Sequence, residues 1–165
     1  MNPWMHQKEV EFIISKLDSN DTMLEWGSGG STVLFSTYVN KYISVEHVKD
    51  WYENVSKEIT KYPLLDITYK HIEPDFPRTK PTQYKEFKTY IEYPGSLGMK
   101  FDKVFIDGRG RAQCAEFILP YLKKDSIVFM HDYFQRPQYH NVEKFYDVIG
   151  GVKDTSQTIV ALRKK

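Results

Sequence analysis

The sequence predicts a single α/β domain, 1–165, in which helices cover both faces of a mainly parallel, seven-stranded sheet that ends in an antiparallel pair. Three observations predict this fold class. Short apolar runs alternate with stretches in which apolar residues recur every three or four positions. A glycine-rich segment directly follows the first of these runs. Two strand-like runs, 148–153 and 158–163, follow one another near the end of the chain.

The first elements follow from spacing and from capping residues. Apolar residues at three- and four-residue intervals predict an amphipathic helix over 9–17, which would lie against the sheet edge or over a ligand. The apolar run 22–26 predicts the first strand. Ser31 or Thr32 is a suitable N-cap for a short helix over 31–40.

The same alternation continues with a strand over 42–46 and a helix over 48–61, which ends near Pro63. Alternating residues predict a third strand over 65–72. The pattern breaks over 73–99, where four prolines surround a stretch, 83–93, that could hold a short helix. Long connections in compact domains tend to be functional, so we expect this one to help cover a substrate.

Regular elements return in the second half. A strand over 103–107 precedes a helix over 111–122, and a further strand covers 126–130. Residues 141–146 are predicted to be helical. Because ligands bind at the carboxyl ends of parallel strands, the residues that end these strands are the first candidates for a functional site.

The segment after the first strand is unlike a dinucleotide fingerprint. Counted from Gly27, the sixth position is Thr32 where that fingerprint needs a glycine, and Glu25 would be a poor neighbour for a phosphate. An acidic residue suits a cationic ligand such as S-adenosylmethionine, which carries an ammonium and a sulfonium and no phosphate. Glu46 ends the next strand about 20 positions further on, where an acid can accept hydrogen bonds from both ribose hydroxyls.

These residues resemble the first motif of the class I S-adenosylmethionine-dependent methyltransferases, an acid followed by Gly-x-Gly, here Glu25 to Gly29. The resemblance implies a Rossmann-like fold and a loop that binds the methionine part of the cofactor, with Glu46 on the ribose and His47 beside the adenosine. The cofactor-binding residues predicted in this way are listed here: Glu25, Gly27, Ser28, Gly29, Ser31, Thr32, Glu46, His47 and Asp107.

A second group of polar residues follows the later strands, with Asp107 after one and the pair His131 and Asp132 after the next. This region resembles a branch of small bacterial and viral methyltransferase-like proteins, and more distantly the metal-dependent sugar O-methyltransferases. Compared with the latter, His131 replaces an acid and Arg109 replaces an aspartate. The sequence therefore leaves open whether a metal binds here and, if so, whether it is Mg²⁺ or Mn²⁺.

The chemistry expected of this group is activation of a hydroxyl. His131 could act as a neutral base that Asp107 or Asp132 orients, or a bound cation could acidify the hydroxyl. These three residues are the catalytic candidates. The candidates for substrate binding are Arg109, Arg111, Tyr133 and His140. The two arginines could bind an anionic group of the substrate or could instead pair with Asp107.

Composition limits the partners. The net charge of +1 gives no reason to expect a nucleic acid, and no apolar run is long enough for a membrane span. The lone cysteine, Cys114, excludes an intrachain disulfide, favours a cytoplasmic setting and is expected to be buried. Whether the chain forms a homo-oligomer stays open.

The sequence therefore favours an O-methyltransferase that transfers a methyl group from S-adenosylmethionine to a hydroxyl of a small molecule or saccharide. Two alternatives come from other classes. An NAD-type Rossmann oxidoreductase would use the same sheet, but the missing glycine and Glu25 argue against it. A non-catalytic S-adenosylmethionine-binding module would keep the loop and Glu46 without needing Asp107, His131 or Asp132.

Overall fold

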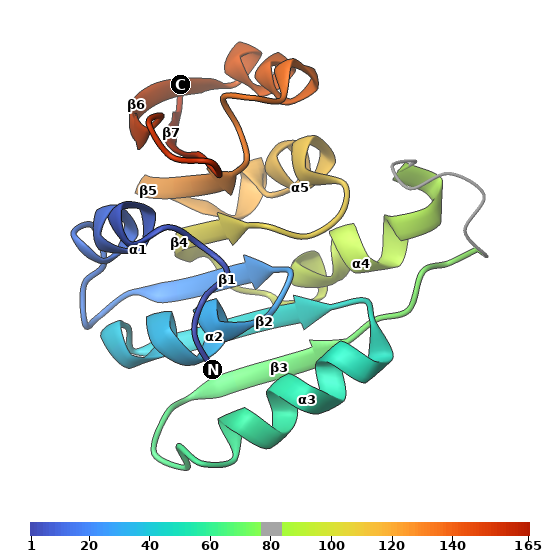
Figure 1. The fold of residues 1–165 in the computed structure, drawn as a ribbon. Coiled ribbons are helices and arrows are strands. Elements are labelled where there is room, and N and C mark those ends of the chain that lie inside the picture. Colours follow the sequence, from blue (N-terminus) through green and yellow to red (C-terminus); the bar gives the residue numbers. More distant parts are fainter. Residues whose placement is uncertain (77–83) are drawn as a thin grey trace.

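The computed structural model describes residues 1–76 and 84–165 and has the predicted three-layer α/β architecture (Figure 1). The helices are α1 (Gln7–Ile14), α2 (Gly30–Phe35), α3 (Lys49–Ile59), α4 (Lys88–Glu92) and α5 (Arg111–Phe117). The strands are β1 (Thr22–Trp26), β2 (Lys41–Glu46), β3 (Ile67–His71), β4 (Phe101–Ile106), β5 (Leu122–His131), β6 (Tyr146–Val152) and β7 (Ile159–Lys164).

The seven strands form one sheet in the order β3-β2-β1-β4-β5-β7-β6. The first five strands along the chain pair in parallel, whereas β7 runs antiparallel to both β5 and β6. The predicted mainly parallel sheet with a closing antiparallel pair is thereby confirmed. The order reverses at β1 and β4, so the carboxyl ends of these two neighbours meet at the point where open α/β sheets bind ligands.

Successive residues of each strand face opposite layers. In β1, Leu24 and Trp26 pack in the core under α4 and α5, whereas Met23 packs in the core that α1 and α2 cover. Glu25 lies on the same side as Met23 by this alternation. The same alternation places Phe105, Phe129 and the end of β5 beneath α1. Side chains at the end of β5 can therefore contact residues of α1.

The helices predicted over 9–17 and 48–61 end slightly early, at Ile14 and Ile59, and two others end five residues earlier than expected. The helix predicted over 31–40 stops at Phe35, and a 3-10 turn follows from Ser36 to Tyr38. The Ser36 and Thr37 hydroxyls donate to the carbonyls of Val33 and Leu34, which competes with continued α-helical bonding.

The second is the helix predicted over 111–122, which stops at Phe117. Pro120 lies in the 3-10 turn Leu119–Tyr121 that follows, because proline has no N–H to continue an α-helix. Residues 141–146 are also corrected, since a 3-10 helix spans Pro137–Lys144 and Tyr146 already begins β6.

The long connection between β3 and β4 holds the predicted short helix as α4, with a 3-10 turn on each side, Tyr84–Phe87 and Tyr93–Leu97. The first residue predicted for this helix, Gln83, and two of the four prolines, Pro77 and Pro81, lie outside the described residues. Tyr90 and Ile91 of α4 are fully buried, so the described part of this connection packs on the sheet.

Cys114 is buried in α5, as expected. Within residues 1–76 and 84–165, no helix is long and apolar enough to cross a membrane.

Candidate functional site

The carboxylate of Glu25 lies beneath the glycine-rich loop and has no exposed surface. Three hydroxyls donate to it, from Ser31 (2.5 Å), Thr32 (2.6 Å) and Ser44 (2.6 Å). Burial raises the pKa of Glu25 to about 7, and these hydrogen bonds lower it only in part. The structure thus places Glu25 where it holds the loop and the start of α2 on the sheet, rather than at an exposed surface.

The glycines of the loop serve different purposes. Gly27 has a φ of +90°, and a Cβ there would lie 2.5 Å from the backbone nitrogen of Gly108, so the loops after β1 and β4 touch through backbone. At Gly30 a Cβ would lie 2.1 Å from the carbonyl carbon of Asn2 in the N-terminal segment. Gly29 differs, because a Cβ added there would lie 3.7 Å from its nearest neighbour, a carbon of the Trp51 ring. Of these three glycines, Gly29 is therefore the one whose Cα could carry a methyl group without a collision.

Glu46 ends β2 and is almost fully buried. Its Oε2 accepts hydrogen bonds from the backbone N–H and the hydroxyl of Ser28, both at 3.0 Å. Its Oε1 accepts from the N–H groups of His47 (2.7 Å) and Val48 (2.8 Å), and His47 Nδ1 lies 3.0 Å away. Burial raises the pKa of Glu46, but these donors outweigh it and hold the pKa below its usual value. A ribose at Glu46 would have to replace the Ser28 hydroxyl.

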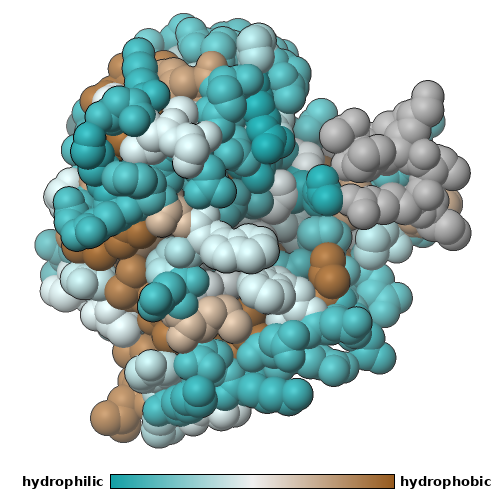
Figure 2. Space-filling model, in the orientation of Figure 1, coloured by the Kyte–Doolittle hydropathy of each residue, from teal (hydrophilic) through white to brown (hydrophobic). Residues whose placement is uncertain are grey.

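A hollow of about 280 Å³ lies at the carboxyl ends of β1 and β4. It is lined by Trp4, Met5, Ser28, Gly29, Gly30, Ser31, Trp51 and Asp107. The rings of Trp4 and Trp51 stack at 6.3 Å between centroids, which brings the N-terminal segment over the loop. Figure 2 shows pale, weakly polar residues across the middle of this face, between the hydrophilic surface of α3 below and a second hydrophilic region above.

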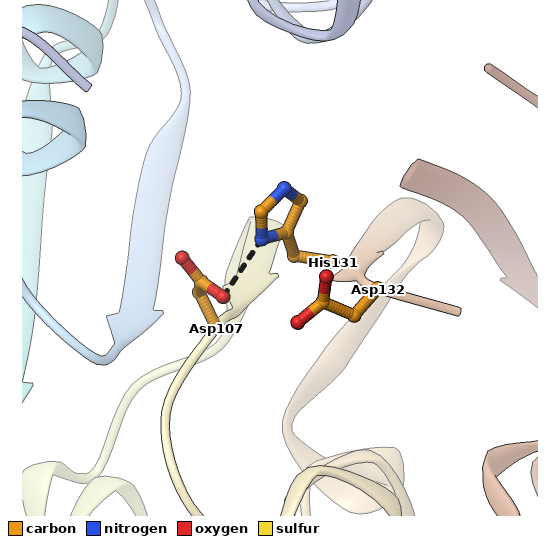
Figure 3. A group of neighbouring side chains, drawn as sticks. All are labelled: Asp107, His131 and Asp132. Carbon is orange, nitrogen blue, oxygen red and sulfur yellow. Dashed lines mark hydrogen bonds and ion pairs between the residues drawn. The ribbon is translucent and has the colours of Figure 1, made fainter. Parts of the chain in front are cut away.

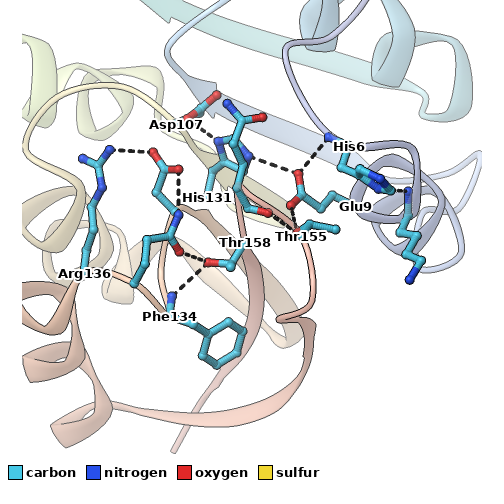
Figure 4. A network of polar contacts seen from close by, with 12 residues as sticks. His6, Glu9, Asp107, His131, Phe134, Arg136, Thr155 and Thr158 are labelled. Carbon is cyan, nitrogen blue, oxygen red and sulfur yellow. Dashed lines mark hydrogen bonds and ion pairs between the residues drawn. The ribbon is translucent and has the colours of Figure 1, made fainter.

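Asp107, His131 and Asp132 come together at the ends of β4 and β5, as predicted (Figure 3). His131 Nδ1 lies 2.9 Å from Asp107 Oδ1. The other ring nitrogen, Nε2, lies 3.3 Å from Oε2 of Glu9, which reaches the sheet from α1 (Figure 4). Both His131 and Glu9 are buried. The imidazole is therefore held between two carboxylates from different layers of the fold.

This environment determines the charge of His131. Burial lowers its pKa, but the hydrogen bond and the charge of Asp107, with the charge of Asp132, outweigh burial and raise the pKa above its usual value. With an acceptor at each nitrogen, the imidazole is stabilised as the doubly protonated cation. The expected role of His131 as a neutral base does not fit these contacts.

Arg111 is the centre of the remaining contacts. Its Nε donates to the Gly108 carbonyl (3.1 Å), and Nη1 donates to the His131 carbonyl (2.5 Å) and to Asp132 Oδ2 (3.2 Å). Its Nη2 contacts the carbonyl and Oδ1 of Asp107, each at 3.0 Å. Four hydrogen bonds and one further ion-pair contact to protein oxygens thus surround the guanidinium. Arg111 therefore holds the ends of β4 and β5 together.

Asp107, His131 and Asp132 offer ligand atoms within 4.8 Å of one another, which is the spacing of a cation site. The chain's own cations already neutralise this group. Asp107 pairs with His131 and Arg111, and Asp132 Oδ2 lies 3.2 Å from Arg111 and 3.0 Å from Arg136. A divalent ion would have to compete with two guanidiniums and an imidazolium, so these residues do not fit Mg²⁺ or Mn²⁺.

The remaining predicted substrate residues lie in two places. Arg109 is half-buried and lines a cavity beside Arg111. Tyr133 is buried, donates to Glu143 (2.7 Å) and packs against the His140 ring, whose Nε2 lies 3.2 Å from the Tyr133 carbonyl. Tyr133 and His140 therefore hold each other and the 3-10 helix after β5.

The sequence analysis missed Trp4, Met5, Gly30 and Trp51, which line the hollow, and it also missed Glu9. Glu9 is the third residue of α1, and its Oε2 also accepts from the His6 backbone N–H at 3.1 Å, which caps the helix. The signal was its position one turn before Ile13, in the buried stripe of the helix. A carboxylate in an apolar stripe needs a buried partner, and here that partner is His131.

Comparison with known proteins gives matches in structure alone. No protein-family model and no curated protein sequence matches the chain. A methyltransferase-like protein from Silicibacter pomeroyi superposes with a TM-score of 0.74 at 23% identity, covering 99% of this chain and 89% of that one.

The ribosomal protein L11 methylase from Lactobacillus delbrueckii gives a TM-score of 0.68 at 12% identity, covering 99% and 82% of the two chains. SMU.1697c from Streptococcus mutans, in complex with SAH, gives 0.68 at 10% identity over 98% and 100%. The fold is that of the class I S-adenosylmethionine-dependent methyltransferases. At these identities the likeness establishes the fold and nothing about an acceptor.

Proposed function

We propose that this methyltransferase-like chain transfers a methyl group from S-adenosylmethionine to a hydroxyl of a small molecule or saccharide. The observation that carries the proposal is the hollow between the glycine-rich loop and Asp107, at the point where the strand order reverses. The structural neighbour SMU.1697c, which shares this fold, was solved with SAH.

The hollow fits the cofactor in two respects. Gly29 offers backbone that no side chain covers closely, and the stacked Trp4 and Trp51 offer an apolar wall. Glu46 would hold the ribose after exchanging its contact with the Ser28 hydroxyl. When bound, the cofactor supplies an electrophilic methyl group on a sulfonium.

Asp107 is the residue we assign to the acceptor hydroxyl. It lines the hollow, and its contacts with His131 and Arg111 both fall on Oδ1. Within the described part of the chain Oδ2 has no such contact, so it can accept the hydroxyl proton as the oxygen attacks. His131, only 2% exposed, acts through Asp107 and is a positioning residue. Holding the two reactants together contributes the rest of the rate enhancement.

The proposal is tested by two measurements on the same protein. Calorimetry with S-adenosylmethionine and SAH should show binding, and transfer of a tritiated methyl group should occur with hydroxylated acceptors. Asp107→Asn should keep SAH binding and lower transfer at least about 100-fold, as expected for a lost general base. Asp125→Asn, an exposed residue of β5, is the matched control. Failure to bind either cofactor form at millimolar concentration rejects the proposal.

One observation favours a second candidate, a non-catalytic S-adenosylmethionine-binding module. The buried charges of Glu9, His131, Asp107 and Arg111 neutralise one another, as they would in a group whose role is structural. In that case SAH binds, no acceptor is methylated, and Asp107→Asn changes stability alone.

A further inference from the structure

A second cavity lies on the other side of the Asp107 and Arg111 pair and has a distinct chemical character. Its volume is about 400 Å³. The lining residues are Gly108, Arg109, Gly110, Arg111, Ala112, Gln113, Arg136, Gln138 and Tyr139. Three guanidiniums, two side-chain amides and a phenol are among them, and none of these residues carries a carboxylate. We call this cavity the arginine pocket.

Arg111 and Arg136 contribute to the pocket in different ways. Arg111 makes four hydrogen bonds and a further ion-pair contact to protein oxygens, so it contributes positive charge and a fixed wall. Arg136 is held at two points, since Nη2 lies 3.0 Å from Asp132 Oδ2 and Nη1 lies 3.4 Å from the Tyr139 hydroxyl. Its side chain is still 42% exposed. Two contacts on a group with five N–H donors leave donors for a ligand.

Tyr139 orders the pocket. Its ring lies 5.9 Å from the guanidinium carbons of both Arg111 and Arg136, which is within cation–π distance. Arg136 is thereby restrained before a ligand arrives, and a restrained arginine loses less conformational entropy on binding than a free one. The pocket is therefore preorganised around its positive charge.

The local charge favours an anion. The lining of the pocket carries three guanidiniums and no carboxylate, and Asp107 and Asp132, which pair with Arg111 and Arg136, are not part of that lining. Guanidiniums match the planar geometry of carboxylates and phosphates and bind both by paired hydrogen bonds.

We propose that the arginine pocket binds the oxyanion group, phosphate or carboxylate, of the acceptor molecule. The acceptor is then a hydroxylated small molecule that carries a negative charge. That the anion belongs to a hydroxylated acceptor rests on the proposed function. The existence of an anion site does not depend on it. Asp107 lines the hollow and Arg111 lines the pocket, and their ion pair of 3.0 Å separates the two. An acceptor anchored by its anion would have to extend past this ion pair to bring its hydroxyl to Asp107.

The test uses three probes of one carbon skeleton: glycerol phosphate, glycerate and glycerol. Calorimetry on the full chain should show binding of at least one of the two anions and none of glycerol. Arg136→Gln and Arg109→Gln should each weaken that binding about tenfold or more, as expected when one charged donor is lost. Arg136→Lys should recover it only in part, because an ammonium cannot form paired hydrogen bonds.

The matched control is Arg163→Gln, which removes an exposed arginine of β7 far along the chain from the pocket. Thermal unfolding of each variant shows whether it is folded. The phosphate and carboxylate arms identify the preferred group. Equal binding of glycerol, no binding of either anion, or unchanged affinity in both glutamine variants overturns the inference. SAH binding is measured in parallel, so its absence with intact anion binding rejects the proposed function and not the anion site.

Discussion

The imidazole of His131 and the carboxylate of Glu9 lie 3.3 Å apart although 122 positions separate them in the sequence. This contact joins the carboxyl end of β5 to α1 and continues through His131 Nδ1 to Asp107. Thr155, from the turn between β6 and β7, donates to the other oxygen of Glu9. The first helix, the sheet and the last hairpin are thus connected through one buried imidazolium.

The raised pKa of His131 predicts how stability depends on pH. Above its usual value of 6.5 the folded chain retains a proton that the unfolded chain releases. The contribution of His131 to the free energy of unfolding is therefore fully present below pH 6.5 and is lost as pH rises through the folded-state value. Asp107→Asn removes the group that raises this pKa and should flatten the dependence in denaturant unfolding.

Glu25 titrates in the same range, and the charge of Asp107 contributes to its raised pKa, so the change in unfolding free energy is read together with a direct measurement on His131. NMR titration of the His131 ring gives the pKa directly. A value at or below 6.5 in the wild type would contradict the assigned imidazolium.

The buried contacts of Glu25 lead to a second prediction about the free energy of unfolding. Replacement by alanine leaves three buried hydroxyls without their acceptor, so Glu25→Ala should lower the free energy of unfolding by at least about 2 kcal/mol. The pKa raised to about 7 means that the folded chain binds the extra proton between pH 4.5 and 7, and stability falls as pH rises through this range. Glu25→Gln should abolish that slope. Glu53→Gln, at an exposed position of α3, should leave both quantities unchanged.

Three glycine substitutions separate strain from binding. Gly98 has a positive φ and open space around it, so Gly98→Ala should lower the free energy of unfolding by about 1 kcal/mol through backbone strain alone. Gly27→Ala adds a collision with the Gly108 backbone and should cost at least about 2 kcal/mol more.

Gly29→Ala should leave the free energy of unfolding near that of the wild type and weaken SAH binding instead, because its methyl enters the hollow. Chemical denaturation and calorimetry measure the two effects. If Gly29→Ala unfolded the chain, the assignment of free backbone at this position would be wrong.

Arg111→Lys tests whether the five contacts of Arg111 hold the strand ends together. A lysine cannot reach the carbonyls of Asp107, Gly108 and His131 together, so the free energy of unfolding should fall by about 2–4 kcal/mol. Arg163→Lys is the control. A change below about 0.5 kcal/mol, the usual range for surface substitutions, would show that the network contributes little.

Much of the sheet could be predicted from sequence because strand alternation and glycine punctuation are local signals. The parallel strands and the closing pair followed from such patterns, and so did the convergence of Asp107, His131 and Asp132. Helix ends were predicted less well, because the hydroxyls of Ser36 and Thr37 compete with helical bonding only in the folded geometry.

The roles of the site residues depended on contacts that no local pattern contains. By its sequence Glu25 is an acid beside a glycine loop, but strand parity turns it under α2, where buried hydroxyls donate to it. Arg111 and His131 were candidates for substrate binding and base catalysis, and the packing of α1 and β5 gives them protein partners instead. The sequence by itself determined which residues end the strands and so meet at one rim. Only the tertiary structure decided which of them face a cavity, because burial and charge pairing arise between segments far apart in the chain.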